Sequence, residues 1–145
     1  MAKGAAAVLA VDDSTLTWEI KRLYFVDDAP VALSRYTIPA AMVPDLDQRD
    51  LHESIMEVLA GYNLKPAFTR ENLSAATARM EEQKLLQVSR SHPLLRFVRL
   101  LKDETGRAIA YIEASLRSDI VNVEVIMGDE PAPEPSTSRG AGENT

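Results

Sequence analysis

The 145-residue sequence contains no cysteine, only two histidines and few aromatic residues. Without cysteine the chain can form no disulfide, no thiolate metal site and no thiol nucleophile. The histidines, His52 and His92, are far apart in the sequence, and there is no glycine-rich phosphate loop and no Ser/His/Asp set. The sequence therefore predicts no metal, no cofactor and no catalytic residues.

Long apolar runs and clustered basic residues are missing too. No run approaches the roughly 18 residues of a membrane span, and residues 5–10 are too short for the core of a signal peptide. The net charge of −6 excludes the basic stripe of a nucleic-acid-binding surface. We expect a cytoplasmic protein with no membrane contact and no direct nucleic-acid contact.

What the chain does contain is a series of hairpin patterns, typical of one domain at this length. Residues 15–26 and 31–38 favour two strands around a turn at 27–30, and residues 94–101 and 108–116 favour a second hairpin. Residues 5–10 and 78–87 favour helices, residues 65–77 an extended strand, and residues 119–127 a final short strand. From Gly128 on, we expect a disordered acidic tail rich in Pro, Ser and Gly.

A further helix is expected between the hairpins. Asp50 followed by Glu53 has the spacing of a capping box. An apolar stripe follows it, and Gly61 closes the segment. The prediction is a helix over residues 51–61.

The two hairpins also repeat one another. Leu9-Ala10-Val11 precedes Arg22 at the same spacing at which Leu86-Gln87-Val88 precedes Arg99. In both copies a short helix leads into a strand, an acidic turn and a return strand. Because hairpins need sheet neighbours, the sequence predicts an α+β fold: an antiparallel β-sheet with flanking helices, built from two helix–hairpin units.

Arg22 is the first candidate binding residue. It shares strand parity with the apolar residues Leu16, Trp18 and Ile20, so its side chain should face the buried side of a strand. An arginine there requires an anion or a strong acceptor, because burying it unpaired is costly. That partner can be a ligand or an internal carboxylate such as Glu113 or Asp119.

A series of motifs in fixed order then suggests a family. They are Arg22-Leu23, Asp27, Pro30, Ala32-Leu33, Arg35, Ile38-Pro39, Ser54-Ile55, Pro93-Leu94-Leu95, Gly106 and Leu116-Arg117-Ser118-Asp119. Over residues 5–127 this order resembles the UTRA domain, the effector-binding half of GntR/HutC-type bacterial transcription regulators. The resemblance implies a chorismate-lyase-like antiparallel sheet, a homodimer and a small-molecule effector. It also implies that DNA is contacted only through a winged helix-turn-helix domain, which we do not find in this sequence.

The resemblance implies a ligand site as well. In the family an R-x-R pair, a glutamate, a helix-opening serine with an aromatic two residues later, and a later Glu and Tyr hold the effector. The matching positions here are Arg22, Tyr24, Ser34, Ser54, Met56, Ala110 and Leu116. Arg22 and Ser54 keep the family's residue type, and the helix start near Ser54 favours an anion. The replacements are smaller or apolar, which favours an apolar or aromatic organic anion over a phosphosugar.

Two other functions stay open at this stage. The domain could be a ligand-free dimerisation or interaction module that pairs through exposed sheet edges. It could also be a chorismate-lyase-like enzyme, with Arg22 binding an anion and Glu113 or Glu71 acting as the acid. Because fold-level analogy is poor support for chemistry, the sequence favours an effector-binding domain that is not an enzyme.

Overall fold

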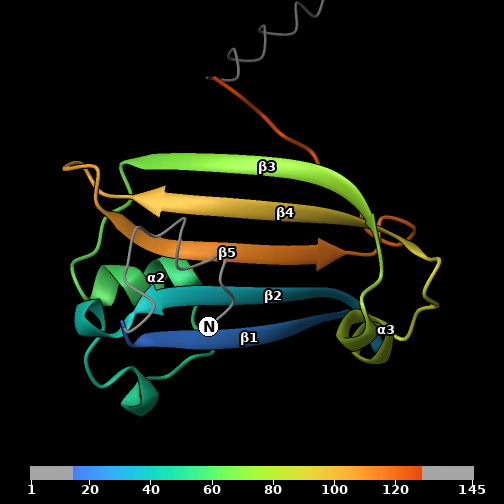
Figure 1. Ribbon diagram of the computed structural model, residues 1–145, viewed down its shortest axis with the longest axis horizontal. Coiled ribbons are helices and arrows are strands. Elements are labelled where there is room, and N and C mark those ends of the chain that lie inside the picture. The colour runs from blue at the N-terminus through green and yellow to red at the C-terminus, as the bar shows by residue number, and fades with distance from the viewer. Residues whose placement is uncertain (1–14, 129–145) are drawn as a thin grey trace, which may run out of the picture.

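Five β-strands form one antiparallel sheet within residues 15–128, the part of the chain that the computed structural model describes. The strands are β1 (Thr17–Val26), β2 (Ala29–Pro39), β3 (Phe68–Thr77), β4 (Pro93–Lys102) and β5 (Ala108–Leu116). Their order across the sheet is β1-β2-β5-β4-β3 (Figure 1). The helix expected at residues 5–10 and the tail expected after Gly128 lie outside the described residues.

Both hairpins are present where the sequence predicts them. The first turns at Asp27 and Asp28, which have φ values of 47° and 64°. Positive φ at both central residues is the geometry that matches the twist of two-residue hairpins. The second turns through Gly106, at φ 84°, where the carboxylate of Asp103 accepts hydrogen bonds from the N–H groups of Thr105 and Arg107.

The two hairpins meet at the centre of the sheet. Residues 32–37 of β2 pair antiparallel with residues 111–116 of β5, so β1–β2 and β5–β4 extend outwards from a shared central pair. This arrangement confirms that two hairpin units build the sheet. Strand β3 adds to the outer edge of β4, in the segment where an extended strand was expected.

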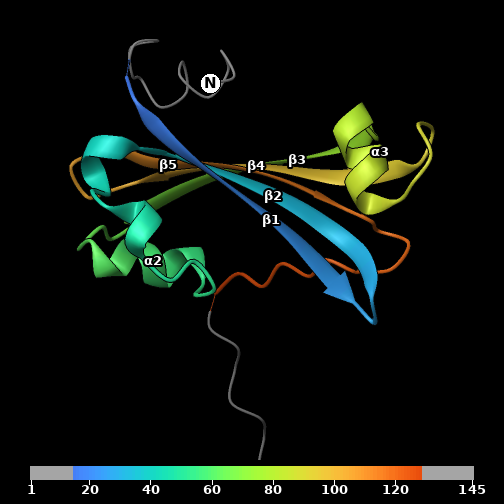
Figure 2. The ribbon, with the colours of Figure 1, turned by 90° about the horizontal axis from the view of Figure 1, so that it is seen from below.

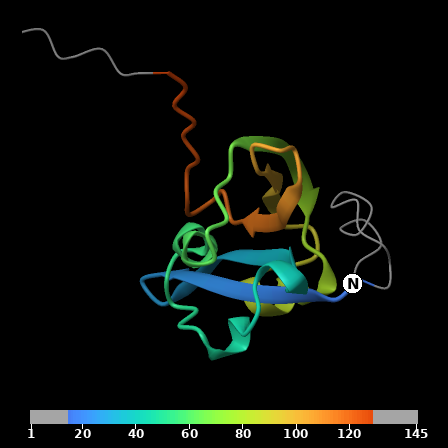
Figure 3. The ribbon, with the colours of Figure 1, turned by 90° about the vertical axis from the view of Figure 1, so that its left-hand side faces the viewer.

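Two α-helices of the described region lie on opposite faces of the sheet, α2 (Ile55–Gly61) and α3 (Met80–Leu86) (Figure 2). Short 3-10 turns at Ala40–Met42 and Leu46–Gln48 connect β2 to α2. In Figure 3, α2 is seen nearly end-on beside the sheet. We call the two sides of the sheet the α2 face and the α3 face.

Strand parity divides the core between these faces. The larger cluster lies on the α2 face and includes Ile20, Tyr36, Ile38, Val58 and Leu59. A smaller cluster on the α3 face contains Leu33, Ala78, Leu86 and Leu94. Leu23 packs against this smaller cluster, which explains why both sides of β1 are apolar in sequence.

Two sequence predictions are wrong, the capping box of the helix that became α2 and the final strand. The helix does not begin behind an Asp50–Glu53 capping box: Ser54 is the N-cap and Glu57 completes the box. Asp50 instead accepts a hydrogen bond from the N–H of His52, 2.9 Å away, a local turn that competes with helix formation.

The final strand expected at residues 119–127 is also not formed. Both edges of β5 are already paired, with β2 and with β4, so the chain after Leu116 has no adjacent edge to join. The β-branched side chains that suggested a strand are exposed instead, with Val125 at 65% and Ile126 at 72%.

Candidate functional site

A cavity of about 300 Å³ opens on the α2 face. It is formed by same-parity residues of the strands together with the first turn of α2. The lining residues are Tyr24, Ala32, Ser34, Tyr36, Ile55, Met56, Glu71, Phe97, Arg99, Ile112, Ala114 and Leu116. Adjacent strands thus place alternate side chains on one wall, and α2 supplies the opposing wall. We call it the α2-face cavity.

Four of the residues predicted for the site line this cavity: Tyr24, Ser34, Met56 and Leu116. Arg22, Ser54 and Ala110 do not line it. Ala110 is fully buried in the core of the α2 face. The structure therefore brings four of the seven predicted residues together at one cavity. The exceptions are the two candidate anion-binding residues, Arg22 and Ser54, and the core residue Ala110.

Arg22 does not line the cavity, although it lies beside the lining residue Tyr36. Its Nη2 donates a hydrogen bond to the backbone oxygen of Leu51, 2.8 Å away, and its guanidinium lies 5.6 Å from the centre of the Tyr36 ring. Its Nε is buried and has no hydrogen-bond partner. The internal carboxylates considered for Arg22 have other partners, because Glu113 pairs with Arg79 and Asp119 pairs with Arg117.

Tyr24 occupies the place of the family's second arginine. Its hydroxyl oxygen lies 2.9 Å from that of Tyr36 on the neighbouring strand. Burial, and next the hydrogen bond with Tyr24, raises the pKa of Tyr36 to about 12. The Tyr36 phenol therefore stays neutral at physiological pH, and both hydroxyl groups can form hydrogen bonds at the cavity wall.

Ser54 has a structural partner already. Its hydroxyl accepts the N–H of Glu57 at 3.2 Å, while the Glu57 carboxylate accepts the N–H of Ser54 at 2.9 Å. These bonds lower the pKa of Glu57, so a carboxylate of the chain itself occupies the start of α2. An external anion would have to compete with Glu57 there.

The charged residues that do line the cavity are Glu71 on β3 and Arg99 on β4. They are direct register partners, and Arg99 Nη2 lies 2.9 Å from Glu71 Oε1. Neither residue was in the predicted ligand-binding set, although Glu71 was a candidate acid of the enzyme alternative and Arg99 was identified as the repeat counterpart of Arg22. The strand residues Ala32, Tyr36, Phe97, Ile112 and Ala114 were also missed, and their strand parity was the available signal. Ile55 on α2 was missed as well, next to the predicted residue Met56.

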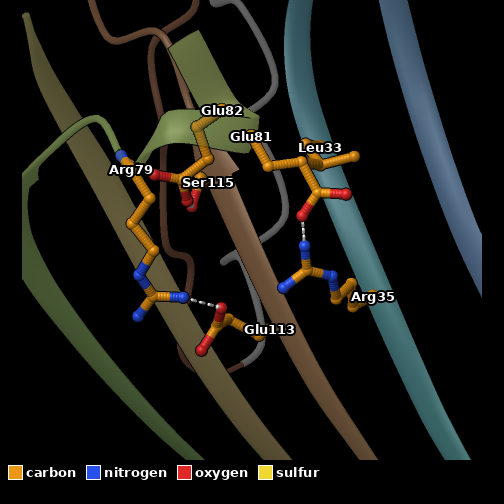
Figure 4. A pocket seen from close by; sticks show the side chains of 7 residues that line it. All are labelled: Leu33, Arg35, Arg79, Glu81, Glu82, Glu113 and Ser115. Carbon is orange, nitrogen blue, oxygen red and sulfur yellow. Dashed lines mark hydrogen bonds and ion pairs between the residues drawn. The ribbon is translucent and has the colours of Figure 1, made fainter. Parts of the chain in front are cut away.

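The α3 face has a smaller and strongly ionic hollow of about 60 Å³, shown in Figure 4. Two ion pairs cross it: Arg35 contacts Glu81, and Arg79 lies 2.6 Å from Glu113. These charges satisfy one another and connect the start of α3 to β2 and β5. Because acids and bases are already matched, this hollow is a structural contact between helix and sheet.

Glu82 is the buried member of this group, with 4% of its surface exposed. It accepts hydrogen bonds from Ser115 Oγ at 2.6 Å, from the Arg79 N–H at 2.7 Å and from Arg96 Nη2 at 2.8 Å. Burial acts to raise the pKa of Glu82, but the hydrogen bonds outweigh it and hold that pKa below its ordinary value. Glu82 thus anchors α3 to the sheet as a carboxylate.

Comparison with known proteins adds a sequence family. The family described as the UTRA domain matches residues 2–122. The HTH-type transcriptional regulator GgaR of Escherichia coli strain K12 is 27% identical over 115 residues, which cover 79% of this chain and 46% of that protein. The HTH-type transcriptional repressor NagR of Bacillus subtilis strain 168 is 24% identical over 115 residues, with 79% and 47% covered. The chain therefore spans about half the length of these curated relatives.

A solved structure has the same fold. The effector domain of PhnF from Mycobacterium smegmatis superposes with a TM-score of 0.78 at 22% identity, covering 89% of this chain and 80% of that one. The predicted antiparallel α+β fold is thereby confirmed. None of the helices that the structure describes in residues 15–128 is long and apolar enough to cross a membrane.

Proposed function

Because the chain belongs to the UTRA domain family, we propose that it is the effector-binding domain of a GntR/HutC-type transcription regulator. Its ligand is a small organic anion with an apolar or aromatic body, and its binding site is the α2-face cavity. The relatives GgaR and NagR are named as HTH-type regulators and are about twice as long. DNA is then contacted by a separate DNA-binding domain.

The observation that carries this proposal is the composition of the cavity. Its volume of about 300 Å³ lies at the lower end of the range for small-molecule sites. Apolar and aromatic side chains dominate its walls, and a few polar groups, Ser34, Tyr24 and Tyr36, converge among them. A lining of this kind orients a compact, largely apolar ligand through a small number of hydrogen bonds.

The mechanism we propose is a population shift. A ligand held between α2 and the sheet stabilises the conformations in which these elements enclose it. In a homodimer, that change alters the spacing of the attached DNA-binding domains and couples ligand affinity to DNA affinity. The dimer and a cytoplasmic location are parts of this proposal.

We propose binding without chemistry. Within the described residues, the carboxylate that lines the cavity is Glu71, and it is ion-paired with Arg99. Glu113, the other candidate acid, faces the α3 hollow and pairs with Arg79. Incubation with chorismate should yield no 4-hydroxybenzoate, and its formation would support the enzyme reading instead.

Thermal-shift measurements test the proposal. Aromatic carboxylates should raise the melting temperature of the protein more than sugar phosphates do. Ala114→Phe, which fills the cavity, should abolish the shift, whereas Ser74→Phe, exposed on strand β3 with the opposite parity to Glu71, is the control and should retain it. Stabilisation by sugar phosphates alone would contradict the ligand class.

One observation favours a second candidate, the ligand-free interaction module. Strand β3 is an edge of the sheet and is exposed along nearly its whole length. An unpaired strand edge can add the strand of a second copy. Light scattering that finds a dimer, together with the absence of any ligand-dependent thermal shift, would favour this function.

A further inference from the structure

The Glu71–Arg99 pair is the charged part of the α2-face cavity. One contact joins the two side chains, 2.9 Å between Nη2 and Oε1, and 28% of the Glu71 side chain and 44% of the Arg99 side chain are exposed. Exposed ion pairs with a single contact contribute little to stability. A ligand can therefore separate this pair at small cost.

Arg22 cannot take the same role in this conformation. Its guanidinium is held by the oxygen of Leu51 and lies beside the Tyr36 ring, and it does not line the cavity. Among the residues that the structure describes, Arg99 is the cation in the cavity lining. Arg99, the counterpart of Arg22 in the internal repeat, is therefore the candidate cation for a ligand in this cavity.

The neighbouring Glu71 restricts what Arg99 can bind. A simple carboxylate that displaced Glu71 would leave two carboxylates beside one guanidinium, and like charges at short range repel. A ligand that also carries an ammonium group removes this penalty, because the ammonium pairs with Glu71. In an α-amino acid both groups sit on one carbon, so together they can bridge two side chains that already lie in contact.

We propose that the α2-face cavity binds an α-amino acid with an apolar or aromatic side chain. Its carboxylate pairs with Arg99, its ammonium group pairs with Glu71, and its side chain packs against Tyr24, Met56 and Phe97. This inference rests on the proposed function and narrows the ligand from an organic anion to a zwitterion. Glu71 is then the residue that selects against simple carboxylates.

The test compares three probes that differ by one charged group. They are L-phenylalanine, 3-phenylpropionate, which lacks the ammonium group, and phenethylamine, which lacks the carboxylate. Isothermal titration calorimetry on the wild-type protein should show L-phenylalanine binding at least tenfold tighter than either analogue. L-leucine and L-methionine extend the panel to apolar side chains without a ring.

Substitutions test whether Arg99 binds the carboxylate of the ligand and Glu71 binds its ammonium group. Arg99→Gln should lower the affinity of the protein for L-phenylalanine at least tenfold, while Arg22→Gln should leave this affinity within twofold of the wild-type value. Glu71→Gln should lower the affinity for L-phenylalanine and raise the affinity for 3-phenylpropionate. An ion pair with a merely structural role would not produce these opposite changes. Arg79→Gln is the matched control, since it breaks an exposed ion pair on the opposite face and should change no affinity. Circular dichroism checks folding, and Arg99→Lys provides a second variant that keeps the charge.

The outcomes separate this inference from the proposed function. If 3-phenylpropionate binds as tightly as L-phenylalanine, or if Arg22→Gln abolishes binding and Arg99→Gln does not, the zwitterion site is overturned while an effector-binding cavity stands. If no amino acid of the panel binds but other aromatic acids shift the melting temperature, the inference again fails alone. If neither amino acids nor organic anions bind, both fail.

Discussion

The hydroxyl oxygens of Tyr24 and Tyr36 lie 2.9 Å apart across β1 and β2. The strand partners of these residues are Ala32 and Ile20, so the contact spans the intervening Arg22–Ser34 pair diagonally. This bond ties the residue that replaces the family's second arginine to a buried core tyrosine. The bond therefore links two lining residues of the cavity that lie on adjacent strands.

The bond makes the titration of Tyr36 depend on Tyr24. Burial, and after it the hydrogen bond with Tyr24, raises the pKa of Tyr36 to about 12. Tyr24→Phe should therefore lower the pKa of Tyr36, though not to the ordinary value of 10.0, because burial remains. Ultraviolet titration of the phenolates measures the change.

Stability at high pH provides a second readout. The pKa of Tyr36 is higher in the folded protein than in the unfolded chain. The contribution of Tyr36 to the free energy of unfolding is therefore fully present below about pH 10 and is lost as the pH rises towards 12. Tyr24→Phe should make this loss of unfolding free energy at high pH smaller. Tyr62→Phe, whose hydroxyl bonds to Pro44 elsewhere, is the control. An unchanged Tyr36 pKa in Tyr24→Phe would show that the bond is not formed in solution.

Glu82→Gln should destabilise the protein by about 3 kcal/mol, the lower end of the cost of removing one partner of a buried ion pair. The loss arises because Arg96, with 12% of its side chain exposed, keeps its charge without a counter-ion. Urea unfolding at neutral pH measures it. Glu113→Gln, which removes a more exposed ion-pair partner, is the control and should cost much less.

The same variant should flatten the acid dependence of stability. The pKa of Glu82 in the folded state is below its ordinary value of 4.5, so its contribution is present above that pH and is lost as the pH falls through the folded value. Wild type should therefore lose stability more steeply than Glu82→Gln below about pH 4.5. Parallel curves for the two proteins would contradict this assignment.

Leu59→Ala and Leu86→Ala form a matched pair of core substitutions on opposite faces. Both leucines are fully buried, so each change should cost about 2–5 kcal/mol in unfolding free energy. Only Leu59→Ala should also weaken ligand binding, because α2 supplies Ile55 and Met56 to the cavity. Calorimetric titration of both variants, under conditions in which both are folded, distinguishes them, and equal weakening would contradict a site on the α2 face.

Asp119 should titrate at about pH 2. Its hydrogen bond from Arg117 is the main cause, and the contact with His92 adds to it. Arg117→Gln should return the Asp119 pKa towards 3.8, and His92→Gln should move it less. Carboxyl chemical shifts followed by NMR report both values. A larger effect of His92→Gln would reverse the order of the two causes.

Local patterns were sufficient for the hairpins and the sheet. The second hairpin pattern predicted residues 108–116 as a strand, with the bounds observed for β5, and the acidic turn at Asp27 and Asp28 was located correctly. The capping box was misplaced because Asp50–Glu53 and Ser54–Glu57 have the same spacing, although Ser54 is of the residue type that the capping-box pattern prefers at its first position. The last strand was predicted from β-branched composition, which does not show whether a partner edge is free.

The sequence by itself determined which residues share a strand face, since period-two geometry needs no tertiary information. The resemblance to the UTRA domain, not strand parity, selected Tyr24, Ser34 and Leu116, and the structure places all three at the α2-face cavity. Only the tertiary structure decided where the charges point. Arg22 donates a hydrogen bond to the backbone oxygen of Leu51, in a loop nearly thirty residues away, while sheet register placed Arg99 against Glu71 at the cavity. A long arginine side chain can reach several hydrogen-bond acceptors and carboxylates. Which of them lie close to it is decided only when the strands assemble into the sheet.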